Sequence, residues 1–374
     1  MFRLLILLGI AALIIFAFRY ASQLQQINPN AETISGGKIT FFPFGTSPFQ
    51  LWIANDDATN LVKLYTANNA GATVSSPPAI SPDLNWVLFD EDPDGEGSQP
   101  PVIKKLSIVS QAVTTLGIGG HPSWSSDGTK IIYCDLGTGK IGIMQNDGSN
   151  KVDLWGDINY ESCDPSWSPD GTKIAFKAHR LTDPDLKASI FVIDVNPDGS
   201  SPRNLRQLTN LNWQYSDHDP TWSPDSQSLV FHRFLGTGPW SLNSGANWNS
   251  FKINLTGVET QLTFANTDQL NGLPVYSPSG SEIMFFNNSA TVDNCPIPVY
   301  RMNSDGSSQR LFWGNPPSPL LCSIFYDWRS LPSLSTPTPT PTPAPTVSPS
   351  PTSTSQPVNT PSPTAIPKGK KRVR

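Results

Sequence analysis

A short motif that recurs six times constrains this chain more than any other feature of its sequence. In its full form the motif reads Pro-x-Trp-Ser-x-Asp-Gly, and five of the six copies are followed by a short run of β-branched and aromatic residues. The copies, the last of them partial, lie at 78–83, 122–128, 165–171, 220–225, 274–280 and 326–330. They are roughly 43 to 55 residues apart, a period typical of β-propellers and solenoids.

The chemistry of this motif predicts a tight β-hairpin at each copy. Proline fixes φ at the start of a turn, aspartate accepts bonds from nearby backbone N–H groups, and glycine tolerates the left-handed conformation. A strand ending in Trp-Ser should therefore be followed by a turn and a second, apolar strand. In the fourth unit two further strands are legible at 189–195 and 204–209. Four strands per unit is the content of one propeller blade.

The first and last units are incomplete in complementary ways. The first unit begins at 37–42 without an opening strand, whereas the last motif, 325–330, is an opening strand with nothing after it. A C-terminal strand that enters the first blade would close the ring and leave no exposed sheet edge. We therefore predict an all-β fold, a six-bladed β-propeller closed by its own C-terminal strand.

These repeats resemble the WD-like repeat of the TolB-type propellers, x-Pro-x-Trp-Ser-Pro-Asp-Gly-x-x-Ile-x-Phe, over about residues 37–330. The match is strong at Trp124, Trp167 and Trp222, weaker at Tyr276 and degenerate at Ile80. The resemblance implies the fold but says little of the function. Propellers of this type serve as binding scaffolds, as enzyme gates and occasionally as lyases.

The N-terminus predicts a membrane anchor. An uninterrupted apolar run covers 4–18, and Phe18-Arg19-Tyr20 stand where a signal peptide would carry small residues for cleavage. We expect 1–22 to be an uncleaved signal anchor that spans the membrane as a helix, with a cleaved signal peptide as the alternative. The chain would then be a single-pass protein of the cell membrane with its propeller outside the cytoplasm.

Composition shifts place the remaining boundaries. A polar spacer is expected at 23–36 and the propeller at 37–330, followed at 331–374 by a Ser/Thr/Pro-rich tail with a basic end. Such a tail has too little apolar surface to fold and should be disordered. The net charge is −5, and the two ends carry +2 and +5, which leaves about −12 for the middle. An acidic body is a poor partner for phosphate backbones, so nucleic acid is excluded.

Long insertions and all four histidines fall on one expected face of the propeller. The insertions lie at 91–101, 178–187, 234–248 and 287–296. Loops on a rigid scaffold commonly carry binding residues. The candidate ligand-binding residues near the channel mouth are His121, Asp164, His179, His218, Asp219 and His232. Two interpretations stay open: a metal or catalytic site built from these groups, or polar residues that simply bond backbone at strand starts.

Two tryptophans in the longest insertion are further candidates. Trp240 and Trp248 are surrounded by glycine, serine and asparagine, and exposed aromatic rings there would suit a peptide or a glycan. The alternative is that both rings pin the loop to its own blade.

One acidic loop has the spacing of calcium ligands. Asp90, Asp92 and Asp94 are followed by Gly95, but Pro101 stands at the twelfth position, where an EF-hand carries glutamate. The EF-hand family is thereby excluded. Calcium binding by this loop and a solvated acidic turn both remain open.

The four cysteines predict two disulfides. Cys134 ends a second strand and Cys163 precedes the next opening strand, and Cys295 and Cys322 repeat that relation three blades later. Four cysteines allow three pairings, and the shared face favours Cys134–Cys163 and Cys295–Cys322. Disulfides indicate an oxidising compartment.

The sequence lacks the nucleophile elbow, the phosphate loop, the zinc-protease helix and the dinucleotide fingerprint. We therefore expect a binding scaffold for a protein, peptide or glycan of the cell envelope, with no required cofactor. The alternative is a metal-assisted lyase or hydrolase that uses the histidines around the channel.

Overall fold

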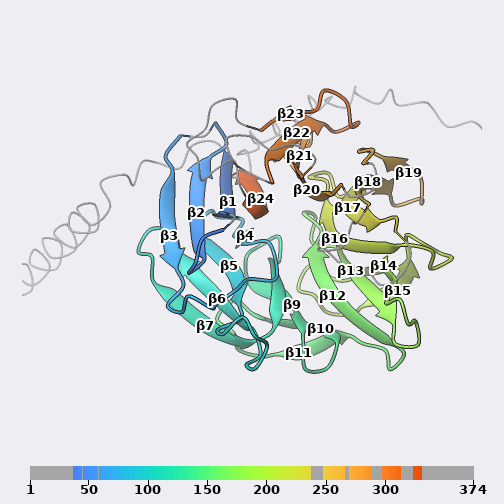
Figure 1. Ribbon diagram of the computed structural model, residues 1–374. Coiled ribbons are helices and arrows are strands. Elements are labelled where there is room, and N and C mark those ends of the chain that lie inside the picture. The colour runs from blue at the N-terminus through green and yellow to red at the C-terminus, as the bar shows by residue number, and fades with distance from the viewer. Residues whose placement is uncertain are drawn as a thin grey trace, which may run out of the picture. The chain divides into compact units, whose positions relative to one another are not determined.

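The structure is a computed structural model that describes residues 37–43, 45–57, 59–236, 247–265, 269–288, 297–312 and 323–330. These residues form six four-stranded antiparallel sheets arranged as blades around an axis (Figure 1). No helix occurs in the described part of the chain. The all-β, six-bladed propeller that the repeat predicts is thus confirmed.

Each blade is built in the same order, from the axis outward. The inner strands are β4 (Ala79–Ile80), β8 (Gly120–Trp124), β12 (Tyr160–Trp167), β16 (Ser216–Trp222), β20 (Asn271–Tyr276) and β24 (Ser323–Ser330). The second strands are β1 (Gly37–Pro43), β5 (Trp86–Glu91), β9 (Lys130–Asp135), β13 (Lys173–Arg180), β17 (Ser228–Phe234) and β21 (Glu282–Asn287). The third strands are β2 (Gln50–Asn55), β6 (Val102–Ser107), β10 (Lys140–Gln145), β14 (Ala188–Asp194), β18 (Trp248–Asn254) and β22 (Val299–Asn303). The outer strands are β3 (Val62–Thr66), β7 (Val113–Ile118), β11 (Val152–Trp155), β15 (Arg203–Gln207), β19 (Glu259–Gln261) and β23 (Arg310–Leu311).

The ring closes as the incomplete first and last units predict. Strand β24 pairs with β1 to complete the first blade, with Gly37 opposite Ser330 and Ile39 opposite Trp328 (red beside blue in Figure 1). The side chain of Asp327 then accepts a hydrogen bond from the backbone N–H of Ile80 at 2.8 Å. This bond joins the closing strand β24 to β4 of the second blade, so the last strand of the ring contacts the second blade as well as the first.

The residues of the motif act as the local chemistry requires. In the third blade the Ser125 hydroxyl donates to Asp127 at 2.6 Å and accepts from the Lys130 N–H at 2.9 Å, which fastens the turn between β8 and β9. Two of the motif tryptophans join neighbouring blades. The Trp124 indole N–H donates to the Ala79 carbonyl of the second blade at 3.0 Å. The Trp222 indole N–H of the fifth blade donates to the Ser166 carbonyl of the fourth blade, also at 3.0 Å.

Strand direction divides the propeller into two faces. Inner and third strands run away from the face that carries the connections 92–101, 136–139, 156–159, 181–187 and 208–215, and we call this the loop face. The opposite face carries the short motif turns, and we call it the turn face. Gly37 and Ser330, the first and last residues of the ring, are paired neighbours at the turn face.

The predicted anchor (1–22), spacer (23–36) and tail (331–374) lie outside the described residues. Where the structure describes the chain, it contains no helix with the length and hydrophobicity to cross a membrane.

Candidate binding site at the propeller axis

The residue before the motif proline has an unusual backbone conformation in four successive blades. The backbone φ lies between 48° and 51° at His121, Asp164, Asp219 and Leu273. This is the left-handed region, which residues other than glycine rarely adopt. Each of the four lies where the register of the inner strand shifts against its second strand, as in a β-bulge. A bulge re-aims a side chain. Here it directs the residue before proline toward the axis, where all four residues line one cavity.

That cavity lies on the axis between the inner strands and is lined by residues from all six blades. It encloses about 670 Å³, including space open to solvent. Six prolines form much of its wall: Pro77, Pro78, Pro122, Pro165, Pro220 and Pro274. Charged or polar side chains line the cavity from the third, fourth and fifth blades, which we call the polar wall, and Asp327 and Arg329 add charged groups from the first blade. Leu273 and Val275 make the sixth-blade side apolar.

The polar wall centres on Asp164. Its Oδ1 lies 2.9 Å from His121 Nδ1 and its Oδ2 lies 3.1 Å from Lys177 Nζ. Burial would raise the pKa of the Asp164 carboxyl, but the positive charges of Lys177 and His121 outweigh it and hold the pKa well below the usual value. Burial disfavours the His121 imidazolium, yet the Asp164 carboxylate raises the pKa of His121 to about 9. At neutral pH this is a charged, paired group.

The two histidines of the fifth blade behave in the opposite way. His218 and His232 stack at 5.7 Å between ring centroids, and Trp248 packs its edge against both. Burial lowers the pKa of His232 to about 3, and burial together with the Lys177 charge lowers the pKa of His218 well below its usual value. Lys177 can only donate, so its 3.2 Å contact makes His218 Nδ1 an acceptor and directs the Nε2 proton to Ser216.

Asp219 is the acid that the polar wall leaves most open to the cavity. Its side chain is 22% exposed, and its Oδ2 lies 3.6 Å from Nε2 of the neutral His232. Burial and the nearby Asp164 charge raise the pKa of the Asp219 carboxyl to about 7. At neutral pH this group therefore exchanges a proton readily and can accept a hydrogen bond or a positive charge from a ligand.

His179 does not join this set. Its Nε2 lies 3.6 Å from Glu161, its pKa is lowered by burial, and it is not among the residues that line the cavity. Trp248 is only 1% exposed, so of the two interpretations left open for this ring, the one with a ring buried against its own blade agrees with the structure. Strand β18 begins at Trp248 and places its ring in the core, where the ring packs against His218 and His232. Trp240 lies outside the described residues.

The three aspartates of the predicted calcium loop do different things. Asp90 is fully buried and accepts from the Ser75 N–H, the Ser75 hydroxyl and the His121 N–H. Asp92 accepts from the Gly95 N–H at 3.1 Å and Asp94 from the Glu96 N–H at 3.0 Å. Among the described residues these carboxylates do not gather into a three-ligand group. Calcium binding stays a prediction, and Asp90 has a clear structural role in holding the His121 backbone.

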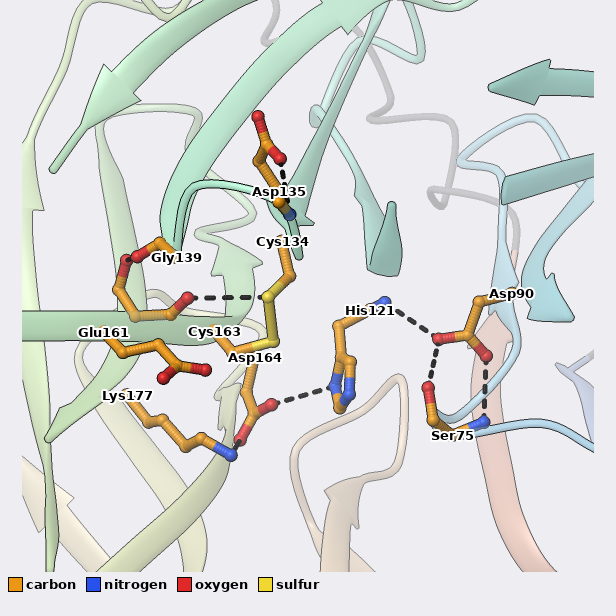
Figure 2. The surroundings of a disulfide bond; sticks show 12 residues. Ser75, Asp90, His121, Cys134, Asp135, Gly139, Glu161, Cys163, Asp164 and Lys177 are labelled. Carbon is orange, nitrogen blue, oxygen red and sulfur yellow. Dashed lines mark hydrogen bonds and ion pairs between the residues drawn. A yellow bond between two sulfur atoms is a disulfide. The ribbon is translucent and has the colours of Figure 1, made fainter. Parts of the chain in front are cut away.

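The Cys134–Cys163 disulfide is confirmed. It joins β9 of the third blade to β12 of the fourth and lies beside the Asp164 carboxylate (Figure 2). Within the described residues, the ligand atoms of His121, Cys163 and Asp164 are the set of three that lie within 4.8 Å of one another. Cys295 and Cys322 lie outside the described residues, so their predicted pairing stays a prediction.

Sequence reasoning missed two features of the site. Lys177 was not singled out, although a lysine inside the apolar stretch of β13 is a visible signal. The exposed apolar residues of the loop face were not noticed either. They are Ile118, Leu136, Ile158, Leu181, Leu186, Leu211 and Phe264, from 41% to 91% exposed. These residues are spread over several connections between strands, so no single motif contains them.

The comparisons with known proteins agree with this geometry. A family model described as TolB beta propeller domain matches residues 111–312. No curated protein matches the chain. Similar solved structures include TolB from Acinetobacter baumannii (19% identity, 81% of this chain and 69% of that one, TM-score 0.57) and putative TolB from Agrobacterium tumefaciens (18%, 79% and 99%, 0.51). A chain of the nidogen/laminin complex is similar at 12% identity (78% and 98%, 0.55). At these identities the structures show the shared fold alone.

Proposed function

The chain belongs to the TolB β-propeller domain family, and we propose that it is a binding scaffold held at the outer face of a membrane, whose loop face captures an envelope protein or peptide. One observation carries this proposal. Seven exposed large apolar side chains gather on the loop face of a propeller whose axial cavity is lined by charged and hydrogen-bonding groups. Apolar groups around polar anchoring groups are the composition of a protein–protein interface.

The chemistry of the cavity favours a peptide over a glycan. Its lining holds one aromatic ring, that of Tyr326, which is 3% exposed. Sugar recognition commonly uses exposed aromatic faces, whereas a proline and aliphatic wall opposite hydrogen-bonding groups suits a peptide segment. Asp219 is the group we expect to meet a donor from that segment. We therefore propose a protein or peptide as the ligand.

The position of the chain ends supports an orientation. Residue 37 enters the ring and residue 330 leaves it side by side at the turn face. An anchor at 1–22 with a spacer at 23–36 would therefore tether the propeller through the turn face. The loop face would then point away from the membrane and be free to meet a partner.

The binding face is tested with a matched pair of positions in the fifth blade. Phe264 lies on the loop face and is 77% exposed, whereas Val258 lies on the turn face and is 64% exposed. A photo-crosslinking phenylalanine analogue is placed at either position in cells that naturally make the protein. We expect a discrete crosslinked partner from position 264 and none from position 258. Equal products from both positions would contradict the proposal.

The cavity is tested in the same experiment. Asp219→Asn in the Phe264 crosslinking background should reduce the crosslinked product several-fold, because the ligand loses its acceptor. His179→Gln, a buried change outside the cavity, should leave the product unchanged. If Asp219→Asn has no effect, the partner binds the rim of the loop face without using the cavity.

The anchor is tested by fractionation. The full chain should stay with the membrane after an alkaline carbonate wash, and protease added outside intact cells should degrade the propeller. A chain that begins at residue 23, directed outward by an unrelated cleaved signal, should be released. Full-length protein that washes off the membrane would overturn the anchor without touching the binding proposal.

A further inference from the structure

Two sulfur atoms, an imidazole and a carboxylate meet between the third and fourth blades, where His121 and Asp164 line the axial cavity (Figure 2). The ligand atoms of His121, Cys163 and Asp164 all lie within 4.8 Å of one another. The Cys134 sulfur is bonded to that of Cys163. Four groups that bind metals are thus held together, while the disulfide occupies both sulfurs.

These are the ligand types that Zn²⁺ prefers. Thiolate, imidazole and carboxylate bind Zn²⁺ at about 2.0 to 2.3 Å in a tetrahedron, which places ligand atoms roughly 3 to 4 Å apart. The present separations therefore need only small movements to enclose an ion. These movements are small relative to the freedom that the two cysteine side chains gain when the bond between them is broken.

The surroundings already orient two of the ligands. Lys177 holds Oδ2 of Asp164 at 3.1 Å, which turns Oδ1 toward His121. Asp90 accepts from the His121 backbone N–H at 3.0 Å and fixes the position of that residue. Groups that orient the ligands commonly change metal affinity by about 10- to 100-fold when they are removed.

We propose that reduction of the Cys134–Cys163 disulfide creates a site for Zn²⁺ or another thiophilic divalent cation, with Cys134, Cys163, His121 and Asp164 as ligands. A dithiol reductant supplies two electrons and two protons. The bond between the two sulfur atoms breaks, each sulfur becomes a thiol, and the reductant leaves as its own disulfide. The incoming cation displaces both thiol protons and the proton of the His121 imidazolium to solvent.

The consequence is a joint between the two blades that persists in both redox states. In the oxidised state the covalent bridge ties β9 to β12, and in the reduced state the cation would tie the same two strands. The wall beside the cavity would keep its shape. This inference does not depend on the proposed partner binding.

The test uses Cd²⁺ as a spectroscopic probe. The full chain carries Cys295→Ser and Cys322→Ser, so that the second cysteine pair cannot bind the cation. Binding is followed by thiolate-to-cadmium charge-transfer absorption. After reduction we expect one equivalent of Cd²⁺ to bind, with competition by Zn²⁺. The oxidised protein should give no such band. His121→Gln should weaken binding of the reduced protein at least about tenfold, whereas His179→Gln should not.

Two results would overturn the proposal: unchanged affinity in His121→Gln, which would mean that the sulfurs act alone, or no binding by reduced protein that is still folded by near-ultraviolet circular dichroism. If reduction unfolds the protein, the thermal midpoint is measured with and without Zn²⁺ instead. A rise that requires His121 supports the site, and no rise refutes it.

Discussion

His121 Nδ1 lies 2.9 Å from Asp164 Oδ1, and this ion pair crosses the boundary between the third and fourth blades. Residues that are one repeat apart in the sequence are thereby joined at the axis. The pair supplies charge to the cavity and also contributes to the stability of the ring.

The ion pair predicts a loss of stability at high pH. Asp164 raises the pKa of His121 from 6.5 to about 9, so its contribution is complete below about pH 6.5 and is lost as the pH rises through about 9. The difference in unfolding free energy between wild type and His121→Gln should fall by roughly 2 to 3 kcal/mol between about pH 6 and pH 10. Urea denaturation at both pH values measures it. A difference that does not change with pH would contradict the pairing.

Asp219 predicts the opposite kind of dependence. Burial and Asp164 raise its pKa from 3.8 to about 7, so the folded state holds a proton that the unfolded state has already lost. Stability should therefore decrease as the pH rises from about 4 to about 7. Asp219→Asn has no carboxyl to ionise, and its stability relative to wild type should increase by roughly 2 to 4 kcal/mol over that range. Parallel curves for the two proteins would show that the Asp219 pKa is ordinary.

Asp327 predicts how firmly the ring is closed. Its two oxygens accept from the N–H groups of Ile80 and Trp328 at 2.8 and 2.9 Å, both in buried surroundings. Asp327→Ala leaves both donors without this acceptor and should cost about 1 to 3 kcal/mol. Amide hydrogen exchange at Ile80 should also accelerate. Asp327→Asn keeps one carbonyl oxygen and should cost less, whereas equal losses would place the effect elsewhere.

The disulfide predicts a sizeable share of the stability. Cys134 and Cys163 are 29 residues apart, and a bridge over such a loop contributes about 3 to 4 kcal/mol by restricting the unfolded chain. Cys134→Ala with Cys163→Ala should lower the unfolding free energy by about this amount. Thermal unfolding of the double variant and wild type, both without reductant, makes the comparison. A double variant as stable as wild type would show that the bridge constrains little.

Much of the fold is predictable because its signals are local. Ser125, Asp127 and Gly128 make a turn whose bonds stay within six residues, and the same chemistry recurs in other blades. The closing strand is predictable for a related reason. The first unit lacks an opening strand, and the last motif is an opening strand with no strands after it. Only pairing the two leaves no free sheet edge.

The site was only partly predictable. His121, Asp164, Asp219, His218 and His232 were predicted near the channel mouth. The first three line the cavity, whereas His218 and His232 are buried in contact with Asp164 and Asp219. For Trp248 the sequence left both an exposed and a buried ring open, and the structure buries it because β18 begins at that residue. The protonation states could not be predicted, since His121 and His218 share a residue type and differ only in which charge lies beside them.

The sequence by itself therefore determined the blades, their number and the way the ring closes. It did so because strand pattern and turn chemistry act over a few residues and repeat. The tertiary structure alone decided that His121, on one repeat, meets Asp164 on the next, with Lys177 and the Cys134–Cys163 bridge beside them. Such contacts depend on how neighbouring blades tilt and how closely they approach around the axis. No local sequence pattern encodes that tilt or that separation.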